Sequence, residues 1–112
     1  MATIAIDFDG TIHDSAHPKQ NMRMGIPLPG AVRAVRELKA AGHTIVIFTV
    51  RGDSKHVRDW LAYYQVPFDH VTNMKLPCDA YIDDRAIAFR GDWEQSMRDL
   101  VDLMPGAMHY GR

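Results

Sequence analysis

The sequence has little of what marks exported, membrane-spanning or strongly charged proteins. Its one cysteine, Cys78, excludes an intrachain disulfide and is compatible with a reducing compartment. No apolar run approaches the about 20 residues that a membrane-spanning helix needs, and no apolar signal segment opens the chain. A formal net charge of -1 provides no bulk attraction to nucleic acid or to anionic membranes. We therefore expect a soluble, cytoplasmic protein.

What the sequence does have is the composition of a globular domain. Its hydrophobic fraction of 46% and its charged fraction of 24% are ordinary for such a protein. A chain of 112 residues has the size of one domain and buries roughly two-thirds of its unfolded surface. We expect residues 1–112 to form a single domain, with a loop or flap at 12–28 and a tail at 105–112.

Short apolar stretches alternate with helical patterns along the chain. The expected strands are residues 3–6, 43–49, 68–72 and 80–82, with a further edge strand at 87–89. The expected helices begin at Gly30, near Asp53 and at Asp92, and the first ends at Gly42. This alternation implies right-handed crossovers and a mostly parallel sheet. The expected fold is therefore α/β, a Rossmann-like three-layer α/β/α sandwich without a cap domain.

The most informative stretch is residues 3–11, where an apolar run ends in Asp7 and Asp9, followed by Gly10 and Thr11. Ligands of open α/β sheets bind outside the carboxyl ends of the strands. Residues i and i+2 of an extended chain project to the same side, so Asp7 and Asp9 can face one site. Two adjacent carboxylates repel each other unless a cation lies between them. Taken alone, the motif is also compatible with an ordinary strand-ending Asp-Gly turn.

Three further strand ends carry polar residues, namely Thr49, the region of Lys75, and the pair Asp83 and Asp84. Parallel strands place their carboxyl ends at one edge of the sheet, so these residues can converge with the first aspartate pair. Carboxylates hold hard cations, while a lysine and a hydroxyl bind phosphate oxygens. The combination indicates phosphoryl transfer at a divalent metal.

With these residues in place, the chain resembles the haloacid dehalogenase superfamily of phosphatases. Residues 7–11, Asp-Phe-Asp-Gly-Thr, match the first motif of that family, and residues 48–49, Phe-Thr, match the second. Lys75 fits the third motif, and residues 83–84, Asp-Asp, match the fourth. The resemblance spans residues 3–84, and its first and fourth motifs are specific in combination.

The resemblance implies an Mg²⁺-dependent phosphomonoester hydrolase with an aspartyl-phosphate intermediate. Asp7 is the expected nucleophile, and Asp9 the expected general acid and then base. Mg²⁺ is expected between Asp7, the backbone carbonyl of Asp9 and Asp83. Asp84 is expected as a further ligand or as the partner that orients Lys75.

The resemblance also implies how the phosphate is held. Thr49 and the backbone N–H of Val50 are expected to bind the phosphoryl oxygens. Lys75 is expected to neutralise the charge of Asp7 and of the phosphate in the transition state. Arg51 is a further candidate for the phosphate, with a solvated arginine beside the site as the alternative.

The chain differs from many relatives in having no room for a cap domain, since the segment 12–28 is too short to be one. An open site admits a bulky phosphorylated substrate, or is completed by another copy in a homo-oligomer. The flap residues considered as substrate contacts are His13, His17, Lys19 and Arg23. For the two histidines, a structural or solvated side chain is the alternative.

Two other functions use similar residues. A receiver-type signalling domain also places acids, threonine and lysine at strand ends, but its phospho-accepting aspartate follows a middle strand. Here Thr49 follows the second strand, and the second acidic pair comes late, after Lys75. A catalytically inert phosphate-binding module is the third reading, although every expected catalytic residue is present. Sugar phosphates, nucleotides and nucleic-acid ends stay open as substrates, the last disfavoured by the near-neutral charge.

Overall fold

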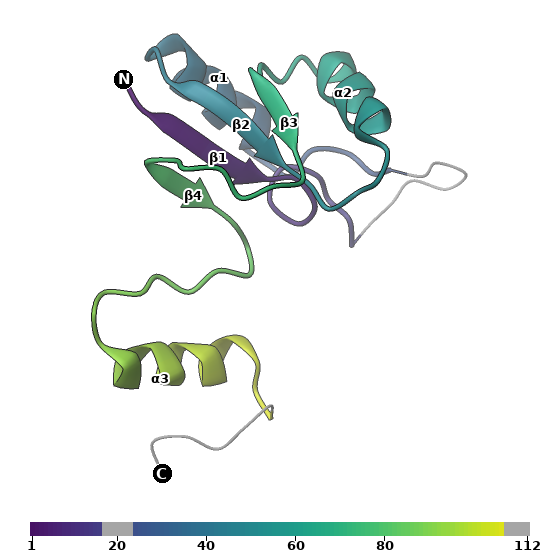
Figure 1. Cartoon of the computed structure of the whole chain (residues 1–112). Coiled ribbons are helices and arrows are strands. Elements are labelled where there is room, and N and C mark those ends of the chain that lie inside the picture. The colour runs from purple at the N-terminus through teal and green to yellow at the C-terminus, as the bar shows by residue number, and fades with distance from the viewer. Residues whose placement is uncertain (17–23, 107–112) are drawn as a thin grey trace.

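A computed structural model describes residues 1–16 and 24–106 and confirms the Rossmann-like α/β class (Figure 1). Along the chain, the elements are β1 (Thr3–Asp7), α1 (Ala31–Ala40), β2 (Thr44–Phe48), α2 (Ser54–Tyr63), β3 (His70–Thr72), β4 (Ala80–Ile82) and α3 (Trp93–Leu103). The four strands form one sheet in the order β3-β2-β1-β4. Each neighbouring pair is parallel, so the carboxyl ends of all four strands lie at the same edge of the sheet.

The two central strands supply the core. In the register of β1 and β2, Ile4 lies beside Ile45 and Ile6 beside Ile47. These side chains share one face of the sheet because residues two apart in a strand point the same way. Helices α1 and α2 contribute apolar side chains to the same cluster, among them Val35 and the fully buried Leu61. The core therefore lies between this face of the sheet and these two helices.

The ends of the helices follow the expected capping chemistry. Gly42, just after α1, has a φ of +94°, and its N–H donates to the carbonyl of Lys39. The side chains of Asp53 and Asp92 each accept N–H hydrogen bonds from residues two and three further on. Both aspartates thus satisfy donors at the start of a helix that have no partner within it.

The chain beyond β4 differs from expectation. The prediction of an edge strand at 87–89 was wrong, because a turn at Asp84 and Arg85 follows β4 and residues 86–90 form no strand. The segment leaves the sheet there, so its backbone has no neighbouring strand to pair with, and α3 lies apart from the sheet (Figure 1). The strand expected at 68–72 is shorter and begins at His70. None of the helices described, including α3, has the length and apolar character needed to cross a membrane.

Candidate active site

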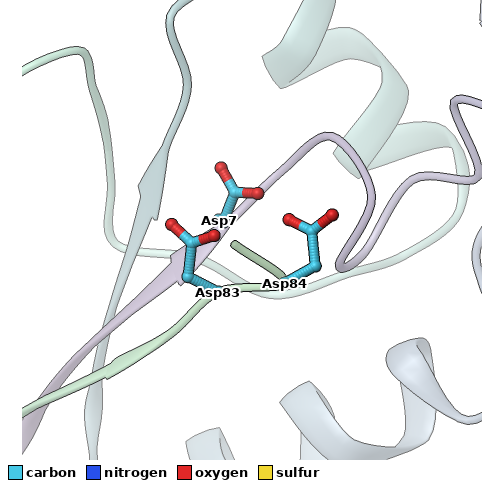
Figure 2. A group of neighbouring side chains, drawn as sticks. All are labelled: Asp7, Asp83 and Asp84. Atoms are coloured by element: carbon cyan, nitrogen blue, oxygen red, sulfur yellow. The ribbon is translucent and has the colours of Figure 1, made fainter. Parts of the chain in front are cut away.

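Three aspartates meet at the carboxyl edge of the sheet. Asp7 is the last residue of β1, and Asp83 and Asp84 directly follow β4. The two strands pair in register up to Ile6 and Ile82, which brings the residues after them side by side. Each aspartate offers a carboxylate oxygen within 4.8 Å of the other two (Figure 2). Several carboxylate oxygens at this spacing match the ligands that Mg²⁺ and Ca²⁺ take in proteins.

The convergence of the three aspartates changes the pKa of Asp7. Burial, the charge of Asp83, and the hydrogen bond and charge of Asp84 together raise the pKa of Asp7 from 3.8 to about 6. A hydrogen bond from Thr11 offsets part of this rise. Each negative neighbour disfavours the ionised form of Asp7, and a cation among the three carboxylates would reverse that effect.

The turn after β1 is shaped to receive Asp84. Gly10 has a φ of +83°, and a Cβ there would overlap Oδ2 of Asp84 and lie 3.0 Å from its Cγ. The hydroxyl of Thr11 accepts the N–H of Asp84 at 3.1 Å and lies 3.4 Å from Oδ2 of Asp7. Gly10 and Thr11 therefore bring the β1 turn and the β4 turn together around the three carboxylates.

The side chain of Asp9 lies in a different environment from that of Asp7. Arg51 binds it with two hydrogen bonds, from Nε to Oδ2 at 2.9 Å and from Nη2 to Oδ1 at 2.8 Å. Nδ1 of His13 lies 2.9 Å from Oδ1 of Asp9. Burial alone would raise the pKa of Asp9, but the hydrogen bonds from Arg51 and His13, together with the charge of Arg51, outweigh it and lower the pKa. Since β1 ends at Asp7, the alternation of side chains along a strand does not extend to Asp9.

The expected metal ligand from Asp9 is its main-chain carbonyl, so the position of its side chain is compatible with that role. Its carboxylate is ionised and held by two partners, whereas the carboxylate of Asp7 is close to other acids. The structure thus gives the two aspartates of the motif different electrostatic surroundings. Separating the environments of two acids is a usual way to assign them different chemical tasks.

Of the flap residues considered as substrate contacts, His13 is buried, with 1% of its surface exposed. It contacts Asp9 from inside the protein instead of facing solvent. His17, Lys19 and Arg23 lie outside the described residues. The sequence contained one signal for the role of His13, its position four residues after Asp9 and next to the apolar Ile12, which is also buried.

The second strand end lies beside the end of β1, because Asp7 pairs with Phe48, the residue before Thr49. Thr49 is 2% exposed, and its hydroxyl accepts the N–H of Arg51 at 3.1 Å. Val50, the next residue, is 81% exposed. Thr49 therefore fixes the start of the loop from which Arg51 reaches Asp9.

Lys75 lines a hollow of about 810 Å³ together with Asp7, Asp83 and Tyr81. Its Nζ lies 5.3 Å from the centroid of the Tyr81 ring, a cation–π contact. Within the described part of the chain, Lys75 forms no ion pair with Asp7. The lysine therefore lines the wall of the site together with Asp7 and Asp83.

No protein-family model and no curated protein matches the chain. Among solved structures, it is similar to a conserved protein from Bacteroides thetaiotaomicron. The two share 26% sequence identity over 90% of each chain, with a TM-score of 0.64. This similarity supports the fold described above.

Proposed function

We propose that the protein is an Mg²⁺-dependent phosphomonoester hydrolase that forms an aspartyl-phosphate on Asp7. The observation that carries the proposal is the convergence of Asp7, Asp83 and Asp84 from two neighbouring strand ends. A second feature supports it. Asp9, two residues after Asp7, is an acid whose side chain is bound by a cation of its own, Arg51. A nucleophile and a separate proton-transfer group are what a two-step hydrolysis requires.

The residues that would hold Mg²⁺ are Asp7, Asp83, Asp84 and the main-chain carbonyl of Asp9. When bound, the ion would neutralise charge on the phosphate and orient it for in-line attack. The raised pKa of Asp7 and the room that Gly10 leaves for Asp84 are features of this chain that fit such a group.

In the first step, an Oδ atom of Asp7 bonds to phosphorus while the bond to the leaving oxygen breaks. Asp9 gives a proton to that oxygen. In the second step, water attacks phosphorus and Asp9 accepts the water's proton, which frees the Asp7 carboxylate and phosphate. Arg51 holds Asp9 ionised in the structure. The first step therefore needs the guanidinium to turn from Asp9 towards the phosphate and Asp9 to take up a proton from solvent. Lys75 and the backbone at Val50 complete the surroundings of the phosphoryl oxygens.

The substrate is a phosphorylated molecule that reaches an uncapped site. The described part of the flap, at residues 12–16 and 24–28, is too small to enclose it. A bulky leaving group or a second copy of the chain at the open side fits this geometry. With a lone cysteine, Cys78, the protein suits the reducing cytoplasm.

The experiment is phosphate release from p-nitrophenyl phosphate with Mg²⁺, with chelator, and with the Asp7→Asn variant. We expect continuous release that requires Mg²⁺ and Asp7. A receiver domain would take up one phosphate per chain and stop. An inert binding module would bind phosphate without release, and activity that survives Asp7→Asn would rule out the covalent mechanism.

A further inference from the structure

The ring of His13, which contacts Asp9, is held in place by packing. The ring of His13 stacks on Phe8 with centroids 5.1 Å apart and planes 3° from parallel. Trp60 packs edge-on against it, with centroids 5.4 Å apart. With 1% of His13 exposed, water does not share its ring nitrogens. The orientation of this ring is therefore set by packing before any substrate binds.

The hydrogen bonds of His13 define its tautomer. The backbone N–H of Gly25 donates to Nε2 at 2.7 Å, so Nε2 carries no proton. The ring's one proton is then on Nδ1, from which it is donated to Oδ1 of Asp9 at 2.9 Å. The imidazole acts as a neutral, oriented donor towards the carboxylate.

Gly25, which donates its N–H to Nε2 of His13, is itself held in place. The carbonyl of Gly25 accepts the indole N–H of Trp60 at 3.0 Å. Gly25 is thus held by α2 through its carbonyl and by His13 through its N–H. A chain of buried contacts runs from α2 through the end of the flap to the carboxylate of Asp9.

We infer that His13 is a positioning residue that reserves Oδ1 of Asp9, so that Oδ2 is the atom that exchanges the proton with substrate and water. The inference rests on the proposed function. Both oxygens contact Arg51 in the structure, but the Arg51 side chain is 34% exposed and long, whereas His13 is buried. When the guanidinium turns to a phosphate, the bond from His13 remains and Oδ2 becomes free to take up a proton from solvent. Oδ2 then passes this proton to the leaving oxygen as the P–O bond breaks, and later takes one from the attacking water.

The inference is tested by how the rate depends on the leaving group. Nitrophenolate departs with little need of a proton, whereas the alkoxide of glycerol 2-phosphate requires one. His13→Phe keeps the stacked ring and removes both hydrogen bonds. We expect it to slow the alkyl ester about 100-fold and the aryl ester less than about 10-fold. In His13→Asn, the side-chain amide takes the place of Nδ1 as a donor to Asp9. This variant should restore most of the wild-type ratio between the rates on the alkyl and the aryl ester.

His43→Asn is the matched control, because His43, like His13, accepts a backbone N–H at one ring nitrogen. Its Nδ1 accepts from Ala2 at 3.0 Å, and it has no hydrogen bond to Asp9 among the described residues. It should leave the ratio between the rates on the two esters unchanged. Equal slowing of both esters by His13→Phe would show a merely structural role and overturn the inference. A wild-type protein that hydrolyses neither ester would refute the proposed function instead.

A second readout does not depend on activity. Long-range proton–nitrogen NMR spectra of the wild-type protein distinguish the two neutral tautomers of a histidine and its charged form. We expect the Nδ1–H tautomer for His13, because Nε2 accepts the N–H of Gly25. The Nε2–H tautomer would remove the donor to Asp9 and overturn the inference even in an active enzyme.

Discussion

Replacing one carboxylate of the cluster should stabilise the metal-free protein and abolish its stabilisation by Mg²⁺. The most informative change is Asp83→Asn. Oδ1 of Asp83 accepts the N–H of Arg85 at 2.9 Å, and an asparagine carbonyl can accept the same bond. The variant therefore removes the negative charge beside Asp7 while keeping the local turn.

The magnitude follows from the pKa of Asp7, which rises from 3.8 to about 6. At about 1.4 kcal/mol per pH unit, such a rise corresponds to about 3 kcal/mol for a fully buried group. Asp7 is partly exposed, so solvent screening reduces the effect to about 1 kcal/mol, of which Asp83 contributes a part. The folded state binds the Asp7 proton more tightly than the unfolded state, so the free energy of unfolding falls as pH rises from about 4 to 6. Asp83→Asn should flatten this fall.

Mg²⁺ acts in the opposite direction. At about 100 times its dissociation constant, a ligand that binds only the folded state adds about 2.7 kcal/mol to the free energy of unfolding. Urea unfolding at pH 7, with Mg²⁺ or with chelator, measures both effects. We expect wild-type protein to gain stability with Mg²⁺ and Asp83→Asn to gain little.

The control is Asp59→Asn, which removes an equal charge from an exposed pair with Lys55 on α2. It should keep the full Mg²⁺ effect and the full pH dependence between 4 and 6. If Asp83→Asn is less stable than wild type without metal, or if Mg²⁺ stabilises both equally, the three carboxylates do not act as a metal site.

Three other changes test separate parts of the site. Asp9→Asn should slow turnover while Mg²⁺ still stabilises the protein, and a loss of metal affinity would mean that the carboxylate of Asp9 is itself a ligand. Gly10→Ala should cost about 1–3 kcal/mol of stability and weaken Mg²⁺ binding, because the Cβ would displace Asp84. Gly91→Ala shares the positive φ but has open space around it, so an equal loss of metal binding there would refute the steric reason. Lys75→Met should lower turnover about 100-fold with the Mg²⁺ stabilisation unchanged, and an unchanged turnover would place Lys75 outside the reaction.

The sequence was sufficient to predict the order of strands and helices and the edge at which the polar residues gather. Apolar runs that alternate with helical patterns have one common solution, a parallel sheet whose strands end at the same edge. Local capping chemistry at Asp53 and Asp92 was also readable, because it depends on neighbours two and three residues away. The prediction of a strand at 87–89 was wrong because a strand needs a neighbouring strand to pair with. Whether one lies nearby depends on the tertiary structure.

Only the tertiary structure decided how the two aspartates of the motif differ. Alternation along a strand does not describe how the side chain of Asp9 is oriented, because β1 ends at Asp7 and the chain turns there. Asp7 then meets the acids that follow β4, while Asp9 meets Arg51, which is 42 positions away in sequence. The sequence left open whether His13 is structural, solvated or a substrate contact, because its burial depends on packing against Trp60 from α2. Residue types and short spacings are local properties, whereas the charge and packing around a carboxylate depend on contacts between distant parts of the chain.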